Sequence, residues 1–306
     1  MRIAVILGYG GSYIKTFSEV LGSLSSEYVI QHIITTDYEK PTRELVDFIK
    51  NSDVILLHTS TLHEEVIEAV KSSNARVVLS FSEVFQELSR GTQILAEAWR
   101  YFKLGGKENI RGLLELVLSY LGINVKPSPP KEIPWHGIWH PELGLYTSLR
   151  DYLKSYPYVN RPLVAVIFYR SRWLVGDTKI VEALVKTLES EGLGAVPIFT
   201  YGFRDYLLNT PTTEDTLREF LIADGKPIVD LVIVLTSFFI LDHGKWHSSE
   251  YRERFNVIEG VKLLNTLNAP IIKPVIEHYE SIDEWLKNPA GISPMTQVYH
   301  VIMPEV

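Results

Sequence analysis

Short apolar runs alternate along the chain with longer amphipathic stretches. In the first third, the apolar runs predict strands at residues 3–7, 29–34, 54–57 and 77–79. Residues 42–50 and 62–71 lie between them and place their apolar residues on one face of a 3.6-residue period, which predicts helices. Almost continuously apolar strands that alternate with helices are typical of a parallel sheet covered on both faces.

A helical region and a proline-rich segment follow this first set of strands. Residues 83–123 are expected to be helical, with an interruption at Gly105-Gly106 and a second helix from Lys107 to Leu121. Four prolines then occur within residues 127–134. Proline fixes extended backbone and excludes a helix, so the sequence predicts a domain boundary here.

A second set of strands and helices follows the prolines. Strands are expected at 163–168, 195–199, 229–235 and 270–275, and a helix at 178–191. We therefore expect an α/β protein with two Rossmann-like parallel-sheet units and flanking helices, joined by a proline-rich connector. The predicted parts are a first unit at 1–125, the connector at 126–160 and a second unit at 161–306.

The composition excludes several classes of function. The 306 residues include no cysteine, which excludes disulfides, thiolate metal sites, iron–sulfur clusters and cysteine nucleophiles. The 30 Lys and Arg residues against 37 Asp and Glu give a net charge of −7, without the basic excess of nucleic-acid binders. No apolar stretch approaches the ~18 residues of a membrane-spanning helix, and the first apolar run is too short for a signal peptide. We expect a soluble, cytoplasmic protein that binds no nucleic acid.

Hydroxyl and aromatic side chains follow nearly every predicted strand. They occur at 8–12, 35–37, 58–60 and 80–82 in the first unit, and at 169–171, 200–202, 236–238 and 276–278 in the second. Ligands of open parallel sheets bind beyond the carboxyl ends of the strands, so these segments are candidates for a binding site. The alternative is that the Ser and Thr residues only cap the next helices.

The most suggestive of these segments is Tyr169, Arg170, Ser171, Arg172 and Trp173. A guanidinium group is well shaped for a carboxylate, and the indole offers a flat apolar face. Thr236 and Ser237 are expected at the same sheet edge. We expect Arg170→Ala to weaken binding of an acidic ligand and to lower the melting temperature by no more than a few degrees. The alternative is an arginine–acid pair at a domain interface.

The dinucleotide-binding fingerprint is incomplete in this sequence, and the P-loop motif does not occur. Gly8 and Gly10 match the first glycines of the dinucleotide fingerprint, but Tyr13 stands where the last glycine is required. No P-loop sequence occurs, so we expect no ATP hydrolysis by this chain alone.

Two histidine pairs have the spacing of helical metal ligands, His136 with His140 and His243 with His247. Prolines or glycines interrupt both, so no tight metal site is expected, and His140 is expected to anchor the connector through hydrogen bonds. Residues 242–254 are polar and aromatic, which fits a surface loop or a mobile flap.

Several segments in the last two thirds of the chain resemble one known family. They are Tyr101–Asn109 with Leu113-Leu114, Gly137–Pro141, Arg161–Ser171, Gly176–Thr178, Trp285 with Gly291–Pro294, and Met303–Val306. In this order and spacing, the chain resembles the N-terminal region of the large subunit of cobaltochelatase, which is similar to the large subunit of magnesium chelatase.

The resemblance implies a part in ATP-dependent insertion of Co²⁺ or Mg²⁺ into a tetrapyrrole, for cobalamin or chlorophyll biosynthesis. In that family the large subunit holds the macrocycle and the metal, and separate AAA+ subunits hydrolyse ATP. Family members are much longer, so we expect a head fragment, a split subunit or a truncated protein without the metal-inserting residues. Its partners would be a corrinoid or porphyrin, the remainder of the large subunit and the AAA+ subunits, with no tightly bound cofactor of its own.

The matching segments also imply further substrate-binding residues: Gly105, Gly106, Glu108, Asn109, His140, Asp177 and Thr178. No residue is expected to be catalytic, because no cluster of acids and imidazoles converges in the sequence pattern. The isolated chain is therefore expected to bind or enclose the ring, without chelation or ATPase activity. The alternatives are a non-enzymatic two-lobed ligand binder and a module that docks the ATPase subunits.

Overall fold

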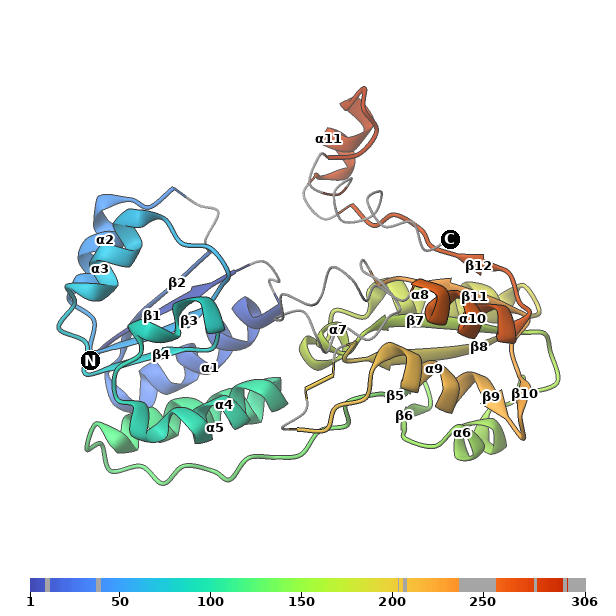
Figure 1. Ribbon diagram of the computed structural model, residues 1–306, viewed down its shortest axis with the longest axis horizontal. Coiled ribbons are helices and arrows are strands. Elements are labelled where there is room, and N and C mark those ends of the chain that lie inside the picture. The colour runs from blue at the N-terminus through green and yellow to red at the C-terminus, as the bar shows by residue number, and fades with distance from the viewer. Residues whose placement is uncertain are drawn as a thin grey trace. The chain divides into compact units, whose positions relative to one another are not determined.

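A computed structural model describes residues 1–8, 12–36, 40–202, 204–205, 208–236, 257–277, 280–293 and 296 (Figure 1). The chain divides into two compact units, Met1–Ile133 and Pro134–Val306. Among the described residues, no helix is both long enough and apolar enough to cross a bilayer.

The first unit is built on a parallel four-stranded sheet with the order β2-β1-β3-β4. Its elements are β1 (Arg2–Leu7), α1 (Ser12–Tyr28), β2 (Gln31–Thr36), α2 (Arg43–Lys50), β3 (Val54–His58), α3 (Glu64–Lys71), β4 (Val77–Ser80), the 3₁₀ helices η1 (Glu83–Leu88) and η2 (Thr92–Ile94), α4 (Leu95–Leu104) and α5 (Gly106–Tyr120). Alternate residues of each strand face opposite sides, so the sheet has two apolar cores.

Different helices cover the two faces of this sheet. Ile3 and Val5 pack with apolar residues of α1, α4 and α5, whereas Ala4 and Ile6 pack with those of α2 and α3. The chain therefore leaves β1 toward one face and leaves the neighbouring strand β3 toward the other. Such a topological switch point opens a crevice between the carboxyl ends of the two strands, where α/β proteins bind ligands.

The second unit contains a mixed six-stranded sheet with the order β12-β11-β7-β8-β5-β6. Its elements are β5 (Gly137–His140), β6 (Gly144–Tyr146), α6 (Leu149–Ser155), β7 (Leu163–Tyr169), α7 (Arg170–Val175), α8 (Lys179–Ser190), β8 (Gly194–Thr200), α9 (Thr213–Leu221), β9 (Ile222–Ala223), β10 (Lys226–Pro227), β11 (Leu231–Val234), α10 (Val257–Leu267), β12 (Ile271–Ile272) and α11 (Ile282–Lys287). Strands β12, β11, β7 and β8 are parallel, and β5 pairs antiparallel with β8 and β6.

The α/β fold class with helix-flanked parallel-sheet units is confirmed, but the expected connector is too long. Residues 137–155 form β5, β6 and α6, which belong to the second unit. They also make the second sheet mixed rather than purely parallel. The sequence did not reveal β5 because it is four residues long and follows prolines, and because its partner is the distant strand β8, through Ile138 and Ile198.

The remaining part of the expected connector is fastened to the first unit. The phenol of Tyr101 donates to the carbonyl of Ser128 at 2.5 Å, and the Ser128 amide donates to the Glu115 carboxylate at 3.0 Å. The amide of Lys131 donates to Oδ1 of Asn109 at 2.8 Å. The prolines therefore keep this segment extended along α5.

Candidate functional site

Parallel strands β7, β8 and β11 end at one edge of the second sheet. Tyr169, the last residue of β7, is in register with Thr200, the last residue of β8. On the other side of β7, the amide of Leu235 donates to the carbonyl of Ile167 at 2.8 Å, which places Thr236 just beyond this edge. We call Tyr169–Arg170, Thr200–Tyr201 and Leu235–Thr236 the second-unit rim.

Arg170 supplies the positive charge of the rim and is buried, with 2% of its surface exposed. Its Nε donates to the carbonyl of Pro134 at 2.7 Å, and its guanidinium lies 4.4 Å from the centre of the Trp135 ring. Arg170 therefore joins the start of the second unit to the rim. The sequence led us to expect only a small effect of Arg170→Ala on stability, whereas this burial indicates a larger one.

An aromatic pair lies beside Arg170. Trp135 and Tyr201 meet edge to face, with ring centres 5.0 Å apart. Burial raises the pKa of Tyr201 to about 12; Asp205 acts in the same direction and Arg170 opposes it. The phenol therefore keeps its proton at neutral pH and is a permanent hydrogen-bond donor.

Thr236 carries a buried hydroxyl that has no hydrogen-bond partner among the described residues. Only 3% of the residue is exposed. A buried hydroxyl without a partner costs about 1–3 kcal/mol, so such groups are rare in native structures and need a physical reason. At the carboxyl end of a parallel strand, a ligand that pairs with the hydroxyl is one such reason.

A chain of polar contacts runs from the rim residue Thr200 to α9. The hydroxyls of Thr200 and Thr216 are 3.2 Å apart, and Nδ1 of His136 lies 3.0 Å from the Thr216 hydroxyl. Nε2 of His136 lies 3.3 Å from the Glu219 carboxylate. Burial lowers the pKa of His136, while Glu219 and Asp215 act against this.

We expect Glu219→Gln to lower the pKa of His136 further, because it removes the nearer carboxylate that favours the imidazolium. The free energy of unfolding would then fall more steeply below pH ~6.5, where the unfolded histidine takes up a proton before the folded one does. NMR titration of the His136 ring protons measures the pKa directly. Glu214→Gln, on the same helix but paired with Arg218, is the control; equal shifts in both variants would contradict the prediction.

The other predicted site residues around α7 are either exposed or paired with other side chains of the second unit. Ser171 and Asp177 are exposed, and Asp177 pairs with Arg172 at 2.7 Å. Thr178 is buried, and its hydroxyl donates to the Glu182 carboxylate at 2.5 Å. Ser237 lies outside the described residues. The structure therefore brings Tyr169, Arg170 and Thr236 together, with Trp135 and Tyr201 as neighbours that the sequence interpretation had given no role with Arg170.

His140 does not belong to the rim. Strand β5 runs antiparallel to β8, so its last residue lies toward the opposite edge of the sheet. The His140 ring accepts hydrogen bonds at Nδ1 from the amides of Glu142 and Leu143, and its Nε2 lies 3.0 Å from the Glu189 carboxylate. Nδ1 thus holds the turn that follows β5 and Nε2 joins β5 to α8, which agrees with an anchoring role.

The remaining predicted residues lie in the first unit. Gly105 and Gly106 have φ values of 68° and 78° and lie where α4 ends and α5 begins. Asn109 is buried and donates to the carbonyls of Gly105 and Lys131 at 2.8 and 2.9 Å. Glu108 pairs with Lys131 at 2.6 Å. Among the described residues, Glu108 and Asn109 thus hold the extended segment around Lys131 that follows α5.

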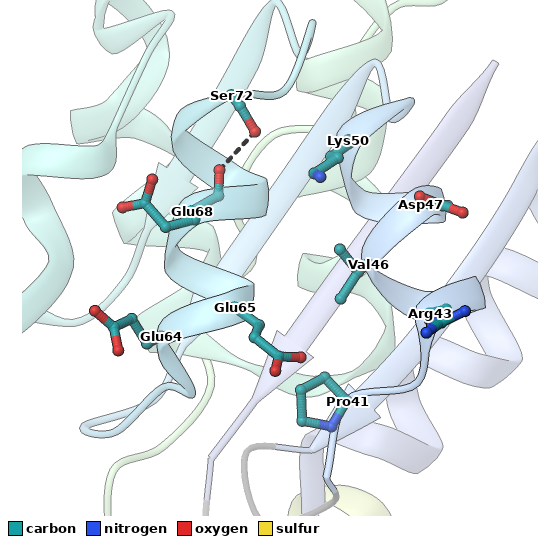
Figure 2. A pocket seen from close by; sticks show the side chains of 9 residues that line it. All are labelled: Pro41, Arg43, Val46, Asp47, Lys50, Glu64, Glu65, Glu68 and Ser72. Atoms are coloured by element: carbon teal, nitrogen blue, oxygen red, sulfur yellow. Dashed lines mark hydrogen bonds between the residues drawn. The ribbon is translucent and has the colours of Figure 1, made fainter.

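One groove of about 690 Å³ lies between α2 and α3 of the first unit (Figure 2). Its charged lining residues carry both signs and are Arg43, Asp47, Lys50, Glu64, Glu65 and Glu68. None of these charged side chains is buried, and none was a candidate from the sequence. The groove is therefore a solvated gap between two surface helices.

His136 and His140 do not form a metal site with other described residues. His136 faces α9 and His140 faces α8. Within the described ranges, no group of three or more His, Asp or Glu side chains is placed to hold a metal ion. His243 and His247, with the rest of residues 242–254, lie outside those ranges.

Comparison with known proteins adds three findings. Residues 99–306 match the sequence profile described as CobN/Magnesium Chelatase. An uncharacterized protein of Methanocaldococcus jannaschii is 24% identical over 284 residues, which cover 92% of this chain and 22% of that protein. The magnesium-chelatase subunit ChlH of Oryza sativa subsp. indica is 26% identical over 230 residues, 67% of this chain and 15% of that subunit.

A solved structure supports the same fold. The catalytic subunit of cobaltochelatase from Mycobacterium tuberculosis superimposes with a TM-score of 0.57 and 18% identity, over 99% of this chain and 24% of that one. The chain thus spans between about a seventh and a quarter of the length of these three proteins.

Proposed function

The chain belongs to the CobN/magnesium chelatase family, and from this premise we propose that it binds the metal-free tetrapyrrole into which the complete chelatase inserts Co²⁺ or Mg²⁺. The metal is then a substrate of the complex rather than a resident cofactor of this chain. We place metal insertion in the remainder of a large subunit and ATP hydrolysis in AAA+ partner subunits. The isolated chain is accordingly proposed to have neither activity.

The buried hydroxyl of Thr236 is the observation that carries this proposal. It is unpaired among the described residues and lies at the edge of a parallel sheet, beside the strand that leads into Arg170. A tetrapyrrole offers pyrrole nitrogens, ring carboxylates and a broad apolar face. Polar groups that converge on a mostly apolar surface suit such a ligand, and Trp135 and Tyr201 supply aromatic surface near Arg170.

Visible-absorbance titration of the full chain tests ring binding. Hydrogenobyrinic acid a,c-diamide and protoporphyrin IX, both metal-free, represent the corrinoid and porphyrin classes. We expect a saturable change of the main absorption band with one of them. The absence of a change with both would reject the proposal.

Thr236→Val is the sharpest variant, because valine keeps the shape of threonine and removes only the hydroxyl. We expect ring affinity to fall about tenfold, the value of one hydrogen bond, and the melting temperature to stay equal or rise. The opposite pattern is expected for Thr178→Val, whose hydroxyl is engaged with Glu182: lower stability and unchanged affinity. A Thr236→Val variant that binds the ring normally would remove this residue from the site.

A docking module is the competing function, and α11 favours it. Three apolar side chains of this helix are exposed, Ile282 at 75%, Trp285 at 44% and Leu286 at 68%. Contiguous exposed apolar residues often mark protein–protein contacts. Under this alternative the chain would bind neither ring, and Leu286→Glu would abolish its association with the remainder of a chelatase large subunit.

A further inference from the structure

A histidine lies at the topological switch point of the first unit. His58 is the last residue of β3 and is in register with Leu7, the last residue of β1. The amide of Gly8 donates to the His58 carbonyl at 2.6 Å, which holds the two strand ends together. The position is the one where open α/β sheets bind ligands.

The His58 imidazole has one nitrogen fixed by a hydrogen bond and the other without a partner among the residues that the structure describes. Its Nδ1 lies 3.2 Å from the carbonyl oxygen of Phe81. A carbonyl only accepts, so Nδ1 carries the proton and Nε2 carries a lone pair. The hydrogen bond of Nδ1 is the one that the ring makes among the described residues, and the side chain is only partly buried. A backbone carbonyl that fixes the distal N–H is the usual arrangement behind a metal-binding imidazole.

Aromatic rings fix the plane of this imidazole. Phe102 of α4 is stacked between Tyr13 and Phe81, with ring centres 4.7 and 4.2 Å away. The edge of His58 meets Phe102 at 4.7 Å and Tyr13 at 5.7 Å. The four rings come from α1, β3, the end of β4 and α4, so residues far apart in the sequence orient one side chain.

This environment keeps the imidazole neutral. Burial lowers the pKa of His58, and the positive charge of Lys103 lowers it further, against the hydrogen bond to Phe81. Nε2 is therefore a lone-pair donor at neutral pH. A core histidine whose only role is packing would have both nitrogens satisfied, as in His140.

The surroundings favour a metal that is already held by another ligand. Within the described ranges, no set of three His, Asp or Glu side chains is placed to hold an ion. A single imidazole holds a hydrated cation only weakly, because protein sites for first-row metals use several ligands. A metal at the centre of a planar macrocycle already has its four equatorial ligands and needs only an axial one.

We propose that Nε2 of His58 is an axial ligand for a first-row transition metal held in a planar macrocycle. The proposed function is binding of a metal-free ring at the second-unit rim. The His58 proposal concerns a different site and a metallated ring, and the two proposals have in common only that the ligand is a planar macrocycle. The switch point of the first unit therefore suits a metallated ring, whereas the second-unit rim suits its metal-free precursor.

Titration of the full chain with ferric protoporphyrin tests the His58 ligand, because ligation by one imidazole moves the main absorption band away from that of free ferric protoporphyrin. We expect saturable binding with this shift, and a loss of affinity of about tenfold or more in His58→Gln. Glutamine retains an amide that can donate to the Phe81 carbonyl but has no nitrogen lone pair. His63→Ala, at an exposed histidine of the same unit, should bind like the wild type.

Three more measurements separate metal ligation from a structural role of His58. In His58→Gly, free imidazole should restore retention of ferric protoporphyrin by the protein, measured after unbound porphyrin is removed, whereas a purely structural role of His58 would leave this retention unchanged by imidazole. Metal-free protoporphyrin should bind wild type and His58→Gln equally, and a parallel loss would overturn the proposal. So would binding of CoCl₂ alone to His58 as tightly as the metallated ring, or an unchanged ferric spectrum in His58→Gln.

The outcomes distinguish the His58 ligand from the proposed function. A chain that binds metal-free rings through Thr236 but gives no His58-dependent ferric spectrum would retain the proposed function and lose the His58 ligand. A chain that gives the His58-dependent spectrum but binds no metal-free ring would retain the His58 ligand and lose the proposed function.

Discussion

Replacing Arg170 by alanine should lower the melting temperature by about 3–20 °C. The carbonyl of Pro134 would lose its buried donor, at about 1–3 kcal/mol, and Trp135 would lose a cation over its ring, at about 0.5–2 kcal/mol. For a unit of this size each kcal/mol corresponds to about 2–4 °C. Differential scanning calorimetry gives both the midpoint and the enthalpy of this transition.

Arg172→Ala is the matched control for this experiment. Arg172 lies two residues further along the same helix, and its ion pair with Asp177 involves a largely exposed carboxylate. Such a pair contributes less than about 1 kcal/mol. Equal melting temperatures for the two variants would contradict the structural role of Arg170. Arg170→Lys should be intermediate, because it keeps the charge but loses the planar group that covers Trp135.

Removing the Glu189 carboxylate should destabilise the second unit by about 2–4 kcal/mol, because it leaves two donors unpaired. Its Oε1 lies 3.0 Å from Nε2 of His140 and accepts from the Tyr156 phenol at 2.8 Å. That phenol also accepts from the amide of Ala195 at 2.6 Å, so the change reaches the first residues of β8. Urea unfolding of Glu189→Ala, followed by circular dichroism, measures the loss.

The control for this variant is Glu191→Ala, an exposed residue just after the same helix, which should change stability by less than about 0.5 kcal/mol. Ring affinity should be equal in both proteins as long as they are folded, because His140 lies away from the second-unit rim. If Glu189→Ala instead binds the ring more weakly at full stability, His140 acts in recognition after all.

Strands buried on both faces were the most predictable part of the fold. The apolar runs located β1, β3, β4, β7 and β8 to within about a residue, because a strand between two helical layers must be apolar at every position. Strand β12 is shorter than expected, with two residues where six were predicted, and only Ile271 is partly buried there while Ile272 is exposed. The antiparallel β5 and β6 were missed, since neither carries an apolar run.

The candidate sites were only partly predictable. The rule that ligands bind at carboxyl ends of strands singles out the segments of Thr236, Arg170 and His58 from the order of apolar runs alone. No sequence pattern indicates that Arg170 is buried over Trp135, because the contact joins residues 35 positions apart in the chain. Tyr13 was considered only as a misfit to a glycine pattern, whereas it packs against His58 and Phe102.

The sequence by itself determined the layer architecture and the family, because both depend on local patterns: the period of apolar residues and the order of short motifs. Only the tertiary structure decided the roles of individual polar residues. His58 and His140 each end a strand, yet within the described residues one nitrogen of His58 at the switch point has no partner, whereas both nitrogens of His140 are hydrogen-bonded. The difference is physical, since a polar group's role depends on which partners the fold brings within about 3 Å of it, and those partners are distant in the chain.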